Sequence, residues 1–99
     1  MSLQRALDLC NQAVALAPDE YAFIDSRAFV RFRLGEMDKA LANVEAALAL
    51  DPDAAEPRFM RGVIKLRQGP VDEGKADLAF ARRQRPGSDE EYASYGVTP

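Results

Sequence analysis

The stretch that decides the fold runs from Leu34 to Pro52 and reads LGEMDKALANVEAALALDP. Its glycine, Gly35, can adopt the left-handed backbone conformation that commonly follows a helix end. Residues 37–50 are rich in alanine and leucine, which are strong helix formers. Asp51 precedes a proline, and the residue before a proline is disfavoured in the helical conformation. The stretch therefore predicts a helix that ends before Gly35 and a second helix over residues 37–50.

Several features of this stretch recur 34 residues away on either side. The matched positions are Pro18, Pro52 and Pro86, Gly35 and Gly69, Asp38 and Asp72, Ala42 and Ala76, and Ala47 and Ala81. Residues 6–19 match residues 40–53 at several positions as well. Chance rarely aligns so many glycines and prolines at one offset, so the chain contains an internal repeat.

Each repeat unit is predicted to be a pair of helices. Residues 21–34 contain no helix breaker, and apolar residues recur there at spacings of three and four, as on one side of a helix. The pair recurs over residues 56–68 and 71–85, separated by a Gly-Pro dipeptide. Connections this short place neighbouring helices antiparallel. Residues 3–17 match a second helix that has no first helix before it.

Small side chains fall at matched positions of the predicted helices. They are Ala28 and Gly62 in the first helices, and Ala40, Ala47, Gly74 and Ala81 in the second helices. Small residues let two backbones approach closely, and larger residues such as Val44 and Leu78 fill the remaining space. A helix of this kind cannot bury its apolar side alone, so we expect a stacked neighbour to cover it.

The 34-residue unit resembles the tetratricopeptide repeat. The resemblance rests on the glycine between the two helices and on Ala40, Val44, Ala47 and Pro52 in the second half. It covers nearly the whole chain and implies an all-α fold, a right-handed superhelical array of antiparallel helix pairs. Gly74 departs from the family pattern, because alanine is usual at that position.

The resemblance implies one domain over residues 1–99 with about two and a half repeats. We expect a half repeat over residues 2–18, full repeats over residues 21–54 and 55–87, and a C-terminal capping helix over residues 88–96. Ser88 followed by Glu91 predicts a capping box, so this last helix should start at Asp89 and end before Gly96. Its two tyrosines would face the last repeat.

Composition and charge exclude several classes of protein. The chain has 99 residues, of which 47% are hydrophobic and 29% charged, as in ordinary globular domains. A net charge of -3 argues against nucleic-acid binding through a broad basic face. The basic cluster of Arg82, Arg83 and Arg85 precedes an acidic run and is expected to be a solvated helix end. No stretch is apolar enough to predict a membrane span.

Catalysis is not expected, because the chain has no histidine and a single cysteine. Cys10 matches the apolar positions of Val44 and Leu78, which favours a small core residue over a nucleophile. No phosphate-binding glycine loop or metal-ligand spacing occurs, so we expect no catalytic residue, no metal and no cofactor. A lone cysteine cannot form an internal disulfide, which favours a cytoplasmic location unless a signal lies upstream of Met1.

The resemblance also implies a site. The first helices of this family line a concave surface that binds peptides, and the groove positions here are Phe29, Phe32, Arg33, Phe59, Val63, Leu66 and Arg67. An apolar floor with one arginine per repeat suits an amphipathic helix or an extended peptide with an acidic group. The alternative is internal packing, with Phe29 or Phe59 covered by neighbouring helices or by the terminal helix folding back. The lysine and asparagine of the family's chaperone-tail clamp are missing.

A second functional hypothesis is structural: a scaffold segment that mediates self-association or packing. The first predicted helix would expose Leu7, Cys10 and Val14, whose cover in a full repeat is the missing helix. Leaving several apolar side chains bare is unfavourable, at roughly 1.5–3 kcal/mol each. We expect either upstream residues, in a longer bacterial protein of this family, or another copy of the chain to cover them.

Overall fold

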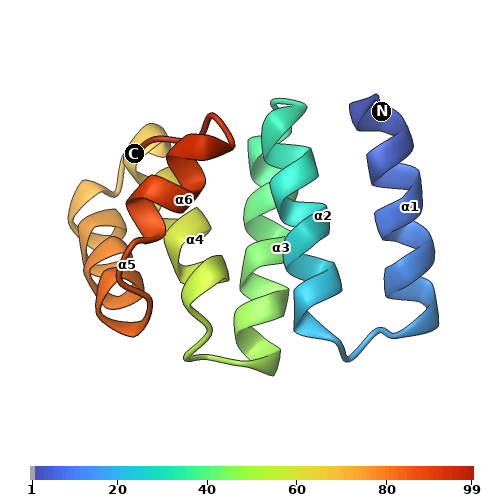
Figure 1. Cartoon of the computed structure of the whole chain (residues 1–99), viewed down its shortest axis with the longest axis horizontal. Coiled ribbons are helices and arrows are strands. Elements are labelled where there is room, and N and C mark those ends of the chain that lie inside the picture. The colour runs from blue at the N-terminus through green and yellow to red at the C-terminus, as the bar shows by residue number, and fades with distance from the viewer. Residues whose placement is uncertain (1) are drawn as a thin grey trace. The chain divides into compact units, whose positions relative to one another are not determined.

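The computed structural model describes residues 2–99, and within them the chain is all-α (Figure 1). The helices are α1 (Leu3–Leu16), α2 (Tyr21–Arg33), α3 (Met37–Leu50), α4 (Ala55–Gln68), α5 (Val71–Gln84) and α6 (Ser88–Ser94). The first five begin and end within one residue of their predicted bounds, and α6 ends two residues before the predicted 96. The all-α class is confirmed.

Glycine ends the first helix of each pair, as predicted. Gly35 has a φ of 81° and Gly69 a φ of 129°, both in the region that favours glycine. At the end of α2, the Gly35 N–H donates to the carbonyl of Phe32 at 3.0 Å, and the Glu36 N–H donates to that of Arg31 at 2.9 Å. These bonds satisfy two carbonyls that the helix leaves without a partner.

The capping box predicted at Ser88 is wrong. Helix α6 begins one residue earlier, and Gly87, with a φ of 93°, precedes it. The Ser88 hydroxyl is buried and donates to the Arg85 carbonyl at 2.6 Å, so it does not cap the helix. The Glu91 carboxylate instead accepts from the Arg85 guanidinium at 2.7 Å. Ser88 and Glu91 therefore both bond to Arg85, and neither caps the backbone N–H groups at the start of α6.

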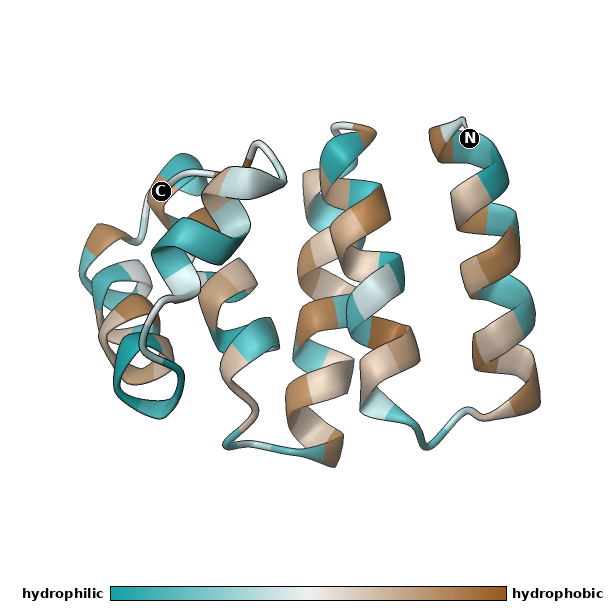
Figure 2. Cartoon of the chain, viewed as in Figure 1, coloured by the Kyte–Doolittle hydropathy of each residue, from teal (hydrophilic) through white to brown (hydrophobic). Residues whose placement is uncertain are grey.

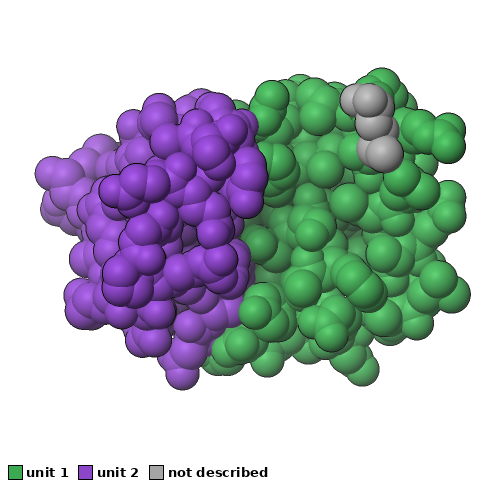
Figure 3. Space-filling view, in the orientation of Figure 1, with its two compact units in different colours: residues 1–52 green, residues 53–99 purple. Residues whose placement is uncertain are grey.

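The chain forms two compact units (Figure 3). The N-terminal unit, Met1–Pro52, contains α1, α2 and α3, with α1 packed on α2 and α2 packed on α3. The C-terminal unit, Asp53–Pro99, contains α4 packed on α5, and α6 packed beside them. The division falls close to the junction of the two predicted full repeats.

The two helix pairs bury matched positions. The α2–α3 pair buries Ala28, Ala40, Val44 and Ala47, and the α4–α5 pair buries Gly62, Gly74, Leu78 and Ala81, each 34 residues further on. Hydrophilic and hydrophobic residues alternate along the helices of both pairs, as in amphipathic helices (Figure 2). The internal repeat therefore defines the core of each pair.

Helices α4 and α5 cross at two glycines. A Cβ atom built on Gly62 would lie 2.9 Å from the carbonyl oxygen of Gly74 and 2.7 Å from Cγ of Leu78. A Cβ atom on Gly74 would lie 2.9 Å from the carbonyl oxygen of Gly62. Side chains do not tolerate such distances, so this crossing is closed to any residue larger than glycine. The departure of Gly74 from the family pattern has its physical reason here.

A buried ion pair distinguishes the C-terminal unit. Asp77 is only 4% exposed and accepts from the Arg61 guanidinium at 2.7 and 2.8 Å, and from Arg58 at 3.4 Å. The matching position in the N-terminal unit is Asn43, which carries no charge. There Arg27, the counterpart of Arg61, donates to Asn11 of α1 at 3.1 Å. The arginine at this repeated position therefore bonds to the following helix in the C-terminal unit and to the preceding helix in the N-terminal unit.

The Gly62→Ala substitution tests the α4–α5 crossing, because helix propensity and the close approach predict opposite changes in the free energy of unfolding. Helix propensity alone predicts that Gly62→Ala stabilises the chain by about 1 kcal/mol. The close approach predicts the opposite, a loss of about 1–3 kcal/mol, because the added methyl group meets the backbone of α5. Urea unfolding followed by circular dichroism measures the change.

The exposed α5 residue Ala76 provides the reference for this experiment. Ala76→Gly is expected to lower the free energy of unfolding by about 1 kcal/mol, which is the difference in helix propensity between alanine and glycine. A Gly62→Ala chain that is more stable than the unmodified chain would contradict the close crossing.

Candidate peptide-binding site

Three of the predicted groove residues of the second repeat, Phe59, Val63 and Arg67, lie on one side of α4. We call this side the α4 stripe and define it by Glu56, Phe59, Met60, Val63 and Arg67, whose spacing follows the helical turn. Phe59, Met60 and Val63 are fully buried, each 0% exposed. Leu66, also predicted for the groove, is half-buried and lies against Gly74 of α5. The apolar floor on α4 is thus present but not open to solvent.

The C-terminal segment, residues 88–99, covers part of the α4 stripe, with contacts at Glu56, Phe59 and Arg67. The Tyr92 ring stacks on Phe59 with 4.4 Å between ring centroids and 11° between planes, and the Tyr92 hydroxyl lies 3.4 Å from the Glu56 carbonyl oxygen. In Figure 1, α6 crosses in front of α4. This is the internal packing expected as the alternative to a ligand. A partner that binds at Phe59 must displace residues 88–99, and its binding there stays a prediction.

The chain after α6 completes this cover through a glycine turn. Gly96 has a φ of 81°, its N–H donates to the Ala93 carbonyl at 2.9 Å, and the Val97 N–H donates to the Tyr92 carbonyl at 2.9 Å. This pair of bonds is the Schellman motif, in which the residue after the glycine is often apolar and packs back on the helix. Val97 is accordingly 0% exposed.

Sequence reasoning missed the contribution of Val97, although the apolar residue directly after Gly96 was its signal. It also missed the contact that follows. The Arg67 guanidinium donates to the Thr98 carbonyl at 3.1 Å, so the arginine of the α4 stripe binds the backbone of the C-terminal segment.

Charges hold the other end of the segment. Arg82 donates to both carboxylate oxygens of Asp89, at 2.7 and 3.0 Å. Arg85 bridges Glu91 at 2.7 Å and Glu56 at 3.3 Å. The expected solvated helix end with nearby counter-charges is therefore confirmed for these two arginines. Exposed pairs of this kind contribute roughly 0–1 kcal/mol each, whereas each large buried apolar side chain contributes about 1.5–3 kcal/mol. The apolar contact therefore dominates the docking of α6.

The matching residues of α2 lie in the N-terminal unit. Phe32 is buried, Phe29 is half-buried and Arg33 is exposed. Phe29 matches Val63 and Arg33 matches Arg67 at the 34-residue offset. The three residues predicted for the first-repeat groove therefore lie on α2, and their exposure increases from Phe32 through Phe29 to Arg33.

The residues predicted for self-association lie on α1. Leu7 is buried, while Cys10 and Val14 are half-buried. Burial raises the pKa of the Cys10 thiol, and the positive charge of Arg27 offsets part of that effect. A raised pKa keeps the thiol protonated near neutral pH, which is typical of a packing residue and unfavourable for a nucleophile.

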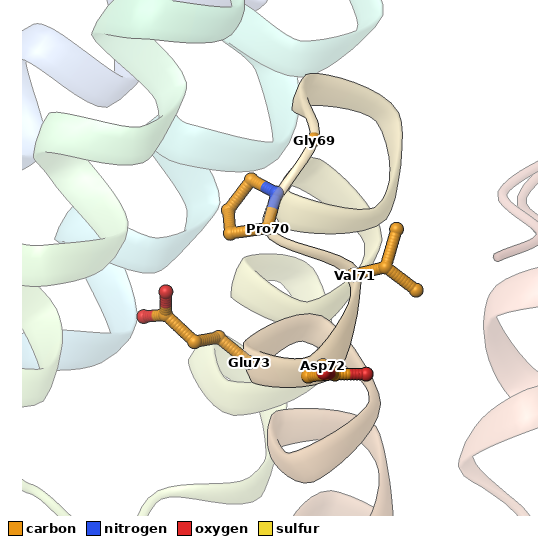
Figure 4. A pocket seen from close by; sticks show the side chains of 5 residues that line it. All are labelled: Gly69, Pro70, Val71, Asp72 and Glu73. Atoms are coloured by element: carbon orange, nitrogen blue, oxygen red, sulfur yellow. The ribbon is translucent and has the colours of Figure 1, made fainter.

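An open pocket lies elsewhere, at the turn between α4 and α5. It is lined by Gly69, Pro70, Val71, Asp72 and Glu73 (Figure 4). Val71 points away from Pro70 and Glu73, so the side chains do not converge on one point. The Glu73 carboxylate is already paired with Lys65 at 3.0 Å. This pocket contains no predicted groove residue and no arrangement that points to a ligand.

Over residues 2–99, no cluster of three or more histidine, cysteine, aspartate or glutamate side chains is placed to hold a metal ion. No helix in the described part of the chain has the length and apolar character needed to cross a membrane. No model of a known protein family and no curated protein matches the chain, so neither family nor function follows from similarity.

The Arg82–Asp89 pair predicts a pH dependence of the docked segment. The hydrogen bond from Arg82 lowers the pKa of the Asp89 carboxyl below its ordinary value, despite a small opposing effect of burial. A group with a lowered pKa contributes stability above its unfolded-state pKa, and that stability is lost as the pH falls through the folded-state pKa. We therefore expect the packing of Tyr92 to weaken below about pH 4, as measured by the near-ultraviolet circular dichroism of the tyrosines.

The chain offers a matched control for this titration in the neighbouring residue Glu90, which is exposed and forms no ion pair with the described residues. Asp89→Asn should flatten the acid part of the profile, and Glu90→Gln should leave it unchanged. Identical profiles for the unmodified chain and Asp89→Asn would show that this pair does not hold the segment.

Proposed function

We propose that the chain is a non-catalytic module that binds a protein or peptide along the apolar side of the first helix of a helix pair. One observation carries the proposal: the α4 stripe already holds a short helical segment, residues 88–99 of this chain. The Phe59 ring stacks against the Tyr92 ring, and the Arg67 guanidinium donates to the Thr98 carbonyl. An apolar anchor of the first kind holds an amphipathic helix in a hydrophobic groove.

Helix α2 supports the same function for the first repeat. It presents an aromatic residue, Phe29, and an arginine, Arg33, at the positions that match Val63 and Arg67. Arg33 is exposed, so its charge can meet an acidic or carbonyl group of a partner. The proposed occupant is an amphipathic helix or an extended peptide with apolar side chains and an acidic group.

The finer fold that we propose is a right-handed superhelical array of about two and a half tetratricopeptide-like repeats with a capping helix. Three features support this: the matched burial at a 34-residue offset, the glycine end of each first helix, and the unpaired second helix α1 at the start. The single cysteine fits a cytoplasmic location, and neither a cofactor nor nucleic acid is part of the proposal.

A scaffold role through self-association is the second candidate, and exposed leucines on α1 favour it. Leu9 is 44% exposed and Leu16 is 87% exposed, while Cys10 and Val14 remain half-buried beside α2. In a full repeat a first helix would cover Cys10 and Val14. A second copy of the chain, or another part of a longer protein, would supply that cover in this alternative.

Substitution of Phe29 tests binding at α2. Peptides selected for affinity to the immobilised chain from a random display library are expected to bind Phe29→Ala at least about tenfold more weakly, because a buried aromatic contact is lost. Fluorescence anisotropy with the selected peptide measures the affinity.

Phe23→Ala is the matched control, because Phe23 lies on the same helix but six residues away and is 40% exposed. It should bind the selected peptide as the unmodified chain does. Equal losses in both variants, or a library that enriches no peptide at all, would count against the function proposed for α2.

Sedimentation equilibrium separates the scaffold alternative from the binding module. Self-association through α1 predicts a dimer at high micromolar concentration that Val14→Lys abolishes and Asp8→Lys preserves, since Asp8 is a polar, exposed residue of the same helix. A monomer at every concentration tested would rule out the scaffold role for this chain.

A further inference from the structure

The segment that covers the α4 stripe is attached to the rest of the unit in a way that allows it to leave. Its helix, α6, has only seven residues, and helices this short are not stable in water without tertiary contacts. The connection to α5 runs through Arg85, Pro86 and Gly87, all of which are exposed. A change of backbone direction there breaks the hydrogen bond from the buried Ser88 hydroxyl to the Arg85 carbonyl but leaves the α4–α5 core in place.

The polar contacts of the segment are also open to competition. Its ion pairs to Arg82 and Arg85 lie between exposed or half-buried side chains, and the hydrogen bond from Arg67 to Thr98 is at the surface. Water or another acidic group can replace any of them. The two buried apolar side chains of the segment, Tyr92 and Val97, are the parts that an incoming partner must reproduce.

The charges around the stripe define the direction and chemistry of its occupant. Arg82 and Arg85 lie at the start of α6 and bind acidic side chains of its first turn, Asp89 and Glu91. Arg67 meets a backbone carbonyl near the other end of the segment. Most of α6 is hydrophilic or neutral in hydropathy (Figure 2), and Tyr92 is its buried aromatic residue. Its acidic charge and one aromatic ring therefore distinguish this ligand.

We propose that the α4 stripe is a regulated binding site, occupied by residues 88–99 until a partner segment of the same pattern displaces them. The pattern is an acidic first helical turn, an aromatic residue, and a glycine turn that places a β-branched residue five positions after the aromatic one. The inference deepens the proposed function, since it names the partner's chemistry and the competitor built into the chain.

A peptide of residues 88–99, labelled with a fluorophore, is the probe. It is titrated with the full unmodified chain and with the full chain carrying Tyr92→Ala and Val97→Ala. In the double variant the competing segment has lost both apolar contacts while the α4 stripe is intact. The peptide should bind the double variant about tenfold or more tightly than the unmodified chain, because a larger fraction of the sites is open.

Two controls make this result specific. A peptide with the same Tyr92→Ala and Val97→Ala changes should not bind either chain. Binding of the unmodified peptide should also raise the melting temperature of the double variant, which shows that the variant is folded and takes up its ligand.

A second variant avoids any change to the apolar contacts. Asp89→Asn with Glu91→Gln weakens only the ion pairs of the segment and leaves Tyr92, Val97 and the α4 stripe as they are. We expect a smaller gain in peptide affinity, about two- to fivefold, because exposed ion pairs contribute little. This variant keeps the inference testable if the double alanine variant does not fold.

Equal affinity of the peptide for the unmodified chain and both variants would overturn the inference, as would peptide binding that does not require the tyrosine and valine. Dimers of the unmodified chain in place of peptide uptake would also overturn it, in favour of exchange of residues 88–99 between copies. A failure here leaves the test at Phe29 of α2 unaffected, so the two proposals can fail separately.

Discussion

The distance between the two helices of a pair governs much of this structure. In the C-terminal unit that distance is set where Gly62 of α4 meets Gly74 of α5, each closed to a Cβ atom by the backbone of the other. The close crossing brings Leu78 against α4 and holds Arg58 and Arg61 within reach of Asp77. The N-terminal unit uses buried alanines, Ala28 and Ala40, at the same positions, so small residues serve both pairs.

The α4–α5 contact also determines which side of α4 is left for a ligand. Arg58, Arg61 and Lys65 are engaged with α5, since each pairs with a carboxylate on that helix. The opposite residues, the α4 stripe, are therefore available, and a helix with an apolar side must bury it. Here residues 88–99 do so. The α4–α5 packing therefore determines both which side of α4 forms the candidate site and which side residues 88–99 contact.

Matched positions in the two repeats do not carry matched chemistry. Asp77 makes a buried ion pair, while Asn43 at the equivalent position leaves Arg27 to bind Asn11 of α1. Val63 is fully buried, while its counterpart Phe29 is only half-buried. A repeat preserves the helix geometry and the core positions, because these depend on small residues and helix ends. The surface residues can differ between the repeats, so the function of each helix pair depends on its own surface residues.

The sequence by itself determined the helices, their ends and the core of each pair. These features depend on local properties: helix propensity, the freedom of glycine at positive φ, and small residues at a 34-residue offset. Even the arrangement of α6 over Phe59 was one of two alternatives that the residues allowed. Only the tertiary structure decided between them, because the stacking of Tyr92 joins residues 33 positions apart, and its stability depends on the spacing of α4 and α5. The same holds for the contact of Arg67 with Thr98, which joins residues 31 positions apart and which no local pattern specifies.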